Sequence, residues 1–262
     1  MNLFFNAFAW IFDPQNWQPG GTSPLPIQDR LLEHLLYTAV AVVIAAAIAL
    51  PLGFYIGHTG KGRQLVIGFT GSMRALPTLG VLFFLTMVLG SLVKGQSGVF
   101  WGTIVALVIL AIPSILAGAY AGLESVSRPV IDAARAVGMT EMQILTRVEI
   151  PLALPLIIGG LRAGTLQVIA TAVIASYAGL GGLGRIIASG IGLNDYDRIL
   201  GGAILVTVFA LVVDAVFAIV QRLTRVSGVS EGTPRQGLRH PTPRPATAAG
   251  AATPIPERNV TA

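Results

Sequence analysis

The stretch that decides the fold is Asp132–Pro155, DAARAVGMTEMQILTRVEIPLALP, a charged and helix-forming segment between two long apolar runs. Ser127 is a good N-cap for a first helix, and Pro129 is tolerated in a first turn. The Asp132 carboxylate near the start of this helix favours it by meeting the positive end of the helix dipole. Gly138 can end the helix in a left-handed conformation. The segment therefore predicts a short helix that stops at a glycine turn.

A second helix is predicted after the turn. Thr140 and Gln143 have the spacing of a capping box, which predicts a helix from Glu141 to about Val148. Pro151 is expected to end that helix, because a proline restricts the residue before it to extended conformations. Such a pair is too short to fold alone and exposes one face. It either docks a soluble partner or packs beneath its own bundle as a connector.

The composition is that of a membrane protein. Hydrophobic residues make up 53% of the 262-residue chain and charged residues 11%, whereas soluble domains carry roughly 25% charged residues. The chain contains no cysteine, which excludes disulfides, thiolate metal sites and cysteine nucleophiles. The net charge of +5 comes mostly from loops beside apolar runs and from a C-terminal tail. It therefore indicates membrane topology rather than nucleic-acid binding.

Five apolar runs are long enough to cross a bilayer, which takes about 20 residues in a helix. They are Leu35–Gly57, Leu65–Leu92, Val99–Ala121, Leu152–Tyr177 and Ile199–Leu223. Pro77 is expected to kink the second run, and residues 178–198 are too rich in glycine and polar residues to span. Close helix contact is permitted by glycines four residues apart, Gly53 with Gly57 and Gly118 with Gly122. The predicted fold class is an all-α, polytopic membrane helical bundle.

The chain divides into three parts. Residues 1–34 form an N-terminal segment in which Met1–Trp17, rich in Phe and Trp, is predicted to lie at the membrane interface; the alternative is a flexible end. Residues 35–225 form the transmembrane domain. Residues 226–262 form a tail whose composition predicts disorder.

Basic residues near the ends of the runs predict the orientation. Seven lie on the side of the helical pair, namely Lys61, Arg63, Arg128, Arg135, Arg147, Arg222 and Arg225, and four on the other, namely Arg30, Lys94, Arg185 and Arg198. Because lysine and arginine favour the cytoplasmic side, the helical pair and the C-terminus are predicted to be cytoplasmic. The N-terminus is then outside.

The helical pair also has a recognisable spacing. Asp132-Ala133-Ala134 is followed by three residues, Gly138, nine residues and Val148-Glu149-Ile150-Pro151. This resembles the EAA motif of ABC importer permeases, E-A-A-x3-G-x9-I-x-L-P, with Asp, Val and Ile in place of Glu, Ile and Leu. The resemblance implies that residues from about 127 to 149 are coupling helices, which seat in a groove of an ATP-hydrolysing subunit. The residues implied in coupling are Asp132, Ala133, Ala134, Gly138, Val148, Ile150 and Pro151.

The likeness covers about Leu35–Leu223. RALPTLGVLFF, DAARAVGMTEMQIL and LPLIIGGLRAGTLQVIATAVIASYAGLGGLGR are similar to the osmoprotectant branch of these permeases, which imports glycine betaine, choline, proline and related solutes. The resemblance implies a type I importer permease, embedded in the lipid of a prokaryotic plasma (inner) membrane. It also implies two copies of an ATP-binding subunit, a second permease, identical or related, and an extracytoplasmic solute-binding protein.

Nucleotide chemistry is not expected in the chain itself. GHTGKG, residues 57–62, has the wrong spacing for a P-loop, and no Ser or Thr follows Lys61. No cofactor is therefore expected in this chain, and ATP and magnesium are assigned to the partner subunit. The three histidines, His34, His58 and His240, show no metal-like or catalytic neighbourhood. An enzyme is not expected.

The glycine-rich run after the fourth span is a candidate gate. Its sequence matches the G-x-G-x-x-G pattern of dinucleotide folds but lacks the surrounding βαβ unit. It is either a flexible extracytoplasmic turn or, as the resemblance implies, a gate or binding-protein contact. The candidate residues are Tyr177, Gly179, Gly181, Gly182 and Gly184, together with Arg74 and Pro77 of the second run.

Three charged residues lie at or inside the apolar runs, where an unpaired charge is expensive. Arg74 can extend toward the cytoplasmic end of its run. Arg162 and Asp214 either form an ion pair, closer than about 6 Å, or line a pathway.

Two other function classes stay open from the residues alone. One is a membrane scaffold that uses the helical pair only to recruit a soluble partner. The other is an ion-driven secondary transporter, although such proteins commonly show relays of intramembrane ionisable residues and inverted repeats that are not evident here. Within the leading class, the main rival substrate is another amino-acid-like solute.

Overall fold

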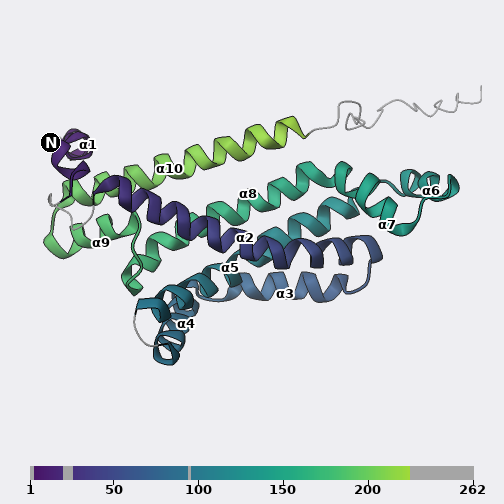
Figure 1. Cartoon of the computed structure of the whole chain (residues 1–262), viewed down its shortest axis with the longest axis horizontal. Coiled ribbons are helices and arrows are strands. Elements are labelled where there is room, and N and C mark those ends of the chain that lie inside the picture. The colour runs from purple at the N-terminus through teal and green to yellow at the C-terminus, as the bar shows by residue number, and fades with distance from the viewer. Residues whose placement is uncertain (1–2, 20–25, 94–95, 225–262) are drawn as a thin grey trace, which may run out of the picture. The chain divides into compact units, whose positions relative to one another are not determined.

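The computed structural model describes residues 3–19, 26–93 and 96–224, and every regular element within these ranges is helical (Figure 1). The elements are α1 (Leu3–Phe12), a 3-10 turn (Pro14–Trp17), α2 (Ile27–Thr59), α3 (Arg63–Ala75), α4 (Thr78–Leu92), α5 (Gln96–Glu124), α6 (Arg128–Ala136), α7 (Glu141–Ile144), a π-helical turn (Leu145–Glu149), α8 (Ile150–Ala175), a 3-10 turn (Ser176–Ala178), α9 (Gly184–Leu193) and α10 (Tyr196–Leu223). Predictions that concern Lys94, Arg225, His240 and residues 226–262 lie outside the described residues, as does the side chain of Arg74.

The structure confirms a bundle of about five spans. The helices α2, α5 and α10 and the helical stretch Glu141–Ala178 are long and apolar enough to cross a membrane. The helices α3 and α4 pass the same test only together and are bent by 89° at their junction, so they form either a broken fifth span or a re-entrant loop. Pro77 lies at this junction, and Leu76 before it is extended, with ψ 132°, as the ring of the following proline requires. The expected kink at Pro77 is therefore a break between two helices.

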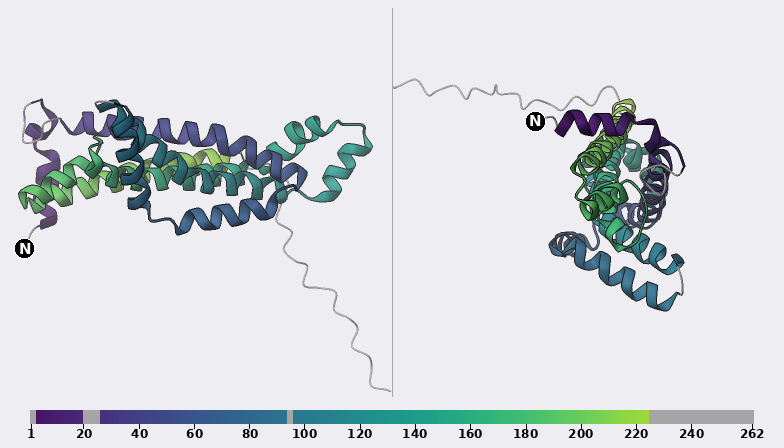
Figure 2. Two further views of the ribbon diagram at one scale, coloured as in Figure 1. Left: turned by 90° about the horizontal axis from the view of Figure 1, so that it is seen from below. Right: turned by 90° about the vertical axis from the view of Figure 1, so that its left-hand side faces the viewer.

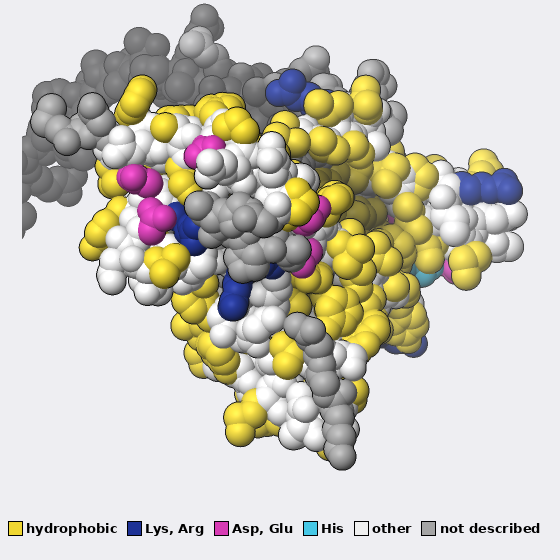
Figure 3. Space-filling model, turned by 60° about the vertical axis from the view of Figure 1, so that its left-hand side comes forward, with side chains coloured by type: hydrophobic (Ala, Val, Ile, Leu, Met, Phe, Trp, Pro, Cys, Tyr) yellow, Lys and Arg dark blue, Asp and Glu magenta, His cyan; other side chains and the backbone are white. Residues whose placement is uncertain are grey.

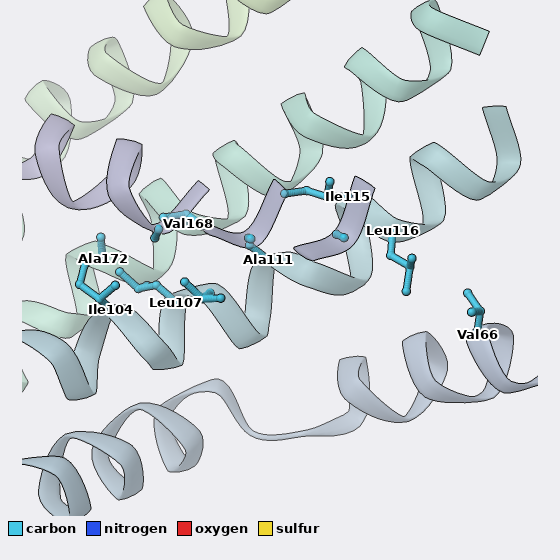
Figure 4. Packing of buried hydrophobic residues seen from close by; sticks show 12 residues of the cluster. Val66, Ile104, Leu107, Ala111, Ile115, Leu116, Val168 and Ala172 are labelled. Carbon is cyan, nitrogen blue, oxygen red and sulfur yellow. The ribbon is translucent and has the colours of Figure 1, made fainter. Parts of the chain in front are cut away.

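The helix α5 packs between α2 and α8, and the small residues predicted for helix contact lie at both interfaces. A Cβ built on Gly53 would lie 2.6 Å from the Cβ of Ala119, and one built on Gly118 would lie 2.5 Å from the Cα of Gly160. A large apolar cluster joins the same three helices and α3 (Figure 4). It includes Ile104, Leu107, Ala111, Ile115 and Leu116 of α5, Val168 and Ala172 of α8, and Val66 of α3.

Gly118→Ala is expected to destabilise the bundle by about 1–3 kcal/mol, the usual cost of overpacking a tight contact. The added methyl group meets backbone atoms of Gly160, which cannot rotate away. The matched control is Gly71→Ala on α3, where nothing lies within 4 Å. Thermal unfolding in detergent checks the prediction: the midpoint of Gly118→Ala should fall while that of Gly71→Ala stays near wild type. Equal midpoints would show that α5 and α8 are not held at this distance.

The two ends of the long helices carry different small elements. In Figures 1 and 2, α6 and α7 lie at one end, and α1 and α9 lie at the other. The predicted N-terminal helix is present as α1, with Phe4, Phe5 and Phe12 exposed. Its position at a membrane interface stays a prediction.

Two features of this end were not anticipated from the sequence. The helix α2 begins at Ile27, before the apolar run that starts at Leu35, and Ile27 is buried against Leu183 and Ile186. The glycine-rich region also contains a regular helix, α9. Its glycines lower helix propensity, but Gly190 allows close contact with α10, where a Cβ would lie 2.8 Å from Ile199.

Much of the molecular surface along the spans is hydrophobic (Figure 3). On α10 the exposed apolar side chains include Val208, Leu211, Val212, Val216 and Ile219. Such a surface needs an apolar environment, from lipid or from a neighbouring protein.

Candidate functional site

The first helix of the predicted pair is α6, and Gly138 ends it as expected. Gly138 has φ +86° with nothing within 4 Å of a Cβ built on it, so the left-handed conformation alone favours glycine here. Ser127 occupies the N-cap position, but its side chain makes no capping hydrogen bond, contrary to prediction. Asp132 lies beyond the first turn, where it is exposed and 3.5 Å from Arg135, so it interacts with a neighbour on its own helix.

The second helix begins as predicted but does not end as predicted. The capping box is present: Thr140 N–H donates to the Gln143 side chain over 2.9 Å, and Gln143 N–H donates to the Thr140 hydroxyl over 3.4 Å. Pro151, however, does not end this helix, which runs through a π-helical turn into α8. Pro151 lies just after this wider turn, so the hydrogen bond that its missing N–H would make to the preceding turn is lost without ending the helix. Ile150 N–H donates to the carbonyl oxygen of Leu145, five residues back, and so keeps the chain helical.

The pair has a buried inner face and an exposed outer face. Ile131 and Ala134 of α6 pack against Ile144 of α7. On the outer face Val137 is 79% exposed and Met142 68% exposed. An exposed apolar surface on a segment with charged neighbours is typical of a protein interaction site.

The motif residues divide between these two faces. Asp132, Ala133 and Gly138 are exposed, so a partner can reach them. Ala134 is buried, and Val148, Ile150 and Pro151 are half-buried. The latter four therefore position the pair and the start of α8 more than they offer surface.

A group of four charged or polar side chains near the pair was missed from the sequence. His58 at the end of α2 lies with Nδ1 2.5 Å from the Glu149 carboxylate and Nε2 3.4 Å from the Glu141 carboxylate. Arg135 donates two hydrogen bonds to Glu141, over 2.8 and 3.1 Å. The hydrogen bond to Glu141 raises the pKa of the Arg135 guanidinium above its usual value. The one available signal was Glu149, a lone acid between the apolar motif residues.

Arg162 and Asp214 form the ion pair that the sequence left as one of two alternatives. Arg162 Nε and Nη2 donate to the two Asp214 carboxylate oxygens over 2.5 and 2.6 Å. The pair joins α8 to α10, as does a 2.7 Å hydrogen bond from the Gln221 side chain to the Pro155 carbonyl oxygen. The two charged side chains keep 34% and 27% of their surface exposed. Pairing does not exclude pathway lining, because the pair is not sealed inside the protein.

The glycine-rich loop is held in place at the opposite end of the spans. Glu33 of α2 accepts a 2.7 Å hydrogen bond from Gly182 N–H, and a Cβ on Gly181 would collide with the same carboxylate. Gly179 and Gly182 have φ +99° and +81°, which only glycine adopts readily. The loop is therefore a turn that is held to α2 by Glu33. The sequence did not predict this contact.

The remaining candidates do not gather into one site. Gly184 packs against Val173 and Ser176, and Tyr177 is half-exposed beside the loop. Pro77 lies at the break between α3 and α4, while Arg162 and Asp214 lie within α8 and α10. Their role as a gate or pathway stays a prediction.

Comparison with known families is decisive for the class of protein. Residues 49–226 match the family described as "Binding-protein-dependent transport system inner membrane component". The chain belongs to this family. Together with its apolar helices, this membership makes it a multi-pass membrane protein and a permease subunit of an ABC importer, as the EAA-like spacing indicated.

Permeases of osmoprotectant transporters are similar to this chain over most of its length. The glycine betaine/carnitine/choline transport system permease protein OpuCB of Bacillus subtilis is 36% identical over 197 residues, which cover 75% of this chain and 88% of the relative. The carnitine transport permease protein OpuCB of Listeria monocytogenes is 38% identical over 185 residues, 70% of this chain and 80% of the relative. The osmoprotectant import permease protein OsmW of Salmonella typhimurium is 33% identical, covering 70% and 84%.

Solved structures support the fold of this permease. A permease chain of the inward-facing MetNI methionine ABC transporter aligns with a TM-score of 0.67 at 22% identity, over 76% of this chain and 96% of that one. A chain from an amino acid ABC transporter structure aligns with a TM-score of 0.60, also at 22% identity, over 75% and 93%. The predicted type I importer fold is thereby confirmed.

Proposed function

We propose that this permease imports an osmoprotectant such as glycine betaine, choline or proline, delivered by an extracytoplasmic solute-binding protein. The solute class rests on the relatives, whose names include glycine betaine, carnitine and choline. Another amino-acid-like solute is the alternative within the same transport class. Whichever solute is carried, the chain forms half of the transport pathway and pairs with a second permease, identical or related.

The observation that carries the mechanism is the α6–α7 pair, with its exposed apolar face at one end of the spans. The pair docks one ATP-binding subunit, and the corresponding pair of the second permease docks the other. ATP and magnesium bind to those subunits and not to this chain. In this arrangement the pair and the C-terminus are cytoplasmic and the N-terminus is outside. Basic residues at the ends of the spans support this orientation.

Movement of the docked pair reaches the spans through covalent and packed contacts. Because the helix runs from Glu141 to Ala178, α8 moves with α7 as one piece. The close contact of Gly118 and Gly160 carries that motion to α5. ATP-driven closure of the partner subunits therefore tilts the helices and exposes the pathway to each side in turn.

Transport in proteoliposomes tests this proposal. The permease is reconstituted with its ATPase subunit and solute-binding protein, and uptake of labelled glycine betaine and choline is followed with and without lumenal ATP. We expect uptake that needs both ATP and the binding protein. Uptake on an ion gradient alone would support a secondary transporter, and no uptake of any solute by the complete assembly would support a scaffold. ATP-driven uptake of a different amino-acid-like solute, unaffected by excess glycine betaine, would change the substrate but not the class.

A further inference from the structure

The coupling pair, α6 and α7, is tied to the first span by a polar contact. His58 is the penultimate residue of α2, and it lies 2.5 Å from Glu149 although 91 residues separate them in the sequence. Its other ring nitrogen lies 3.4 Å from Glu141, which Arg135 also holds. The four side chains thus form a network of contacts that links α2 to the π-helical turn and to α7, and α7 to α6.

The contact between His58 and Glu149 is the buried part of this network. The Glu149 side chain is 4% exposed and that of His58 is 14% exposed. Burial of a carboxylate is costly unless a partner compensates it. Among the described residues, His58 is the one side chain hydrogen-bonded to Glu149. The buried position of Glu149 therefore depends on His58, and the contact is far more sheltered than the Arg63–Glu124 pair nearby, which is 58% and 40% exposed.

The contact matters because of how the spans connect to the coupling pair. The helix α8 continues directly from α7, and α5 is joined to α6 by the short turn between Glu124 and Arg128. The helix α2, in contrast, ends about 70 residues before α6 begins. It has no short covalent connection to the pair, so its tip follows the pair through noncovalent contacts, of which His58 makes a polar one.

We infer that His58, through Glu149 and Glu141, is a positioning residue that makes the end of α2 move with the coupling pair during each ATP cycle. This inference rests on the proposed docking of the pair by an ATPase. It names α2 as a third span driven by that partner, in addition to α5 and α8. The competing explanation is that α2 follows α5 through the Gly53 and Gly57 contacts and needs no link at its tip.

His58→Gln and Glu149→Gln in the reconstituted transporter separate these explanations, with the ATPase rate and the uptake rate both measured. We expect ATPase activity within about twofold of wild type and a fall in solute moved per ATP of about fivefold or more, the lower end of typical coupling between sites. The double variant should fall no further than either single variant, because both remove one contact. Arg63→Gln is the matched control and should couple normally, since exposed ion pairs contribute little. Normal coupling in both Gln variants would overturn the inference, as would an equal defect in Arg63→Gln.

A covalent replacement of the contact covers the case in which the Gln variants fail to assemble. The chain has no cysteine, so His58→Cys with Glu149→Cys can be bridged specifically by a short, reducible bis-thiosulfonate reagent, with partner subunits also free of cysteine. We expect bridging to restore solute moved per ATP toward wild type and reduction to reverse it. No effect of the bridge, or a further loss because the two residues must separate, would overturn the inference. Failure of ATP-dependent uptake in the wild-type transporter would instead count against the proposed function itself.

Discussion

Gly138→Val is expected to lower ATP-driven uptake by about tenfold or more. A β-branched residue in the left-handed conformation costs about 1–3 kcal/mol of backbone strain, and about 1.4 kcal/mol corresponds to a factor of ten. Gly138 has φ +86° and open space around it, so the penalty comes from the backbone and not from a clash. The turn sets the angle between α6 and α7, which also meet through a small apolar cluster that includes Ile131 and Ile144 and through the Arg135–Glu141 ion pair. A changed angle misplaces the outer face of the pair. Insertion of the spans, which lie outside this turn, should be unaffected.

Two control variants separate a docking defect from general backbone strain. Gly138→Asn should keep most activity, because asparagine tolerates the left-handed region. Gly62→Val carries a similar strain, at φ +82° and also in open space, but in the turn between α2 and α3. Uptake per assembled transporter and copurification of the ATPase subunit are the measurements. Full uptake by Gly138→Val, or an equal loss in Gly62→Val, would contradict a docking role for the pair.

Local signals explain what the sequence predicted correctly. A capping box is made by Thr140 and Gln143 alone, and the glycine turn by Gly138 alone, so neither depends on distant residues. The spans follow from apolar length, which the membrane sets. The end expected at Pro151 was wrong because the helix passes through a π-helical turn just before the proline and continues, although the proline lacks a backbone donor.

Contacts between distant residues explain what the sequence could not provide. His58 and Glu149 are 91 residues apart, and Glu33 and Gly182 are 149 residues apart. Neither pair shows a local sequence pattern, and each contact forms only when the helices lie side by side in the fold. Pairing of Arg162 with Asp214 was one of two alternatives that the sequence left open, because charges are so rare within the spans that few combinations exist. Scarcity of charge, and not geometry, brought these two residues together as candidates.

Arg162→Met is expected to lower the amount of folded permease in the membrane by about tenfold or more, because it leaves the Asp214 carboxylate without its partner inside a span. Asp214→Asn leaves Arg162 unpaired and should do the same. The double variant Arg162→Gln with Asp214→Asn removes both charges and keeps the capacity for a hydrogen bond between α8 and α10. It should accumulate closer to wild-type levels than either single variant. Yield of monodisperse protein after detergent extraction measures this, and equal yields in all variants would show that the pair does not stabilise the bundle.

Uptake by the double variant then decides between the two roles of the pair. If Arg162 and Asp214 only join α8 to α10, the neutral pair should transport at a rate close to wild type for each assembled transporter. If their exposed surface, 34% and 27%, also lines the pathway, the variant should assemble but transport slowly, and the loss should differ between zwitterionic glycine betaine and cationic choline. A partly exposed pair of opposite charges within a span must face water or another protein, because lipid solvates neither charge. We therefore expect assembly with reduced transport, and wild-type uptake of both solutes would assign the pair to stability alone.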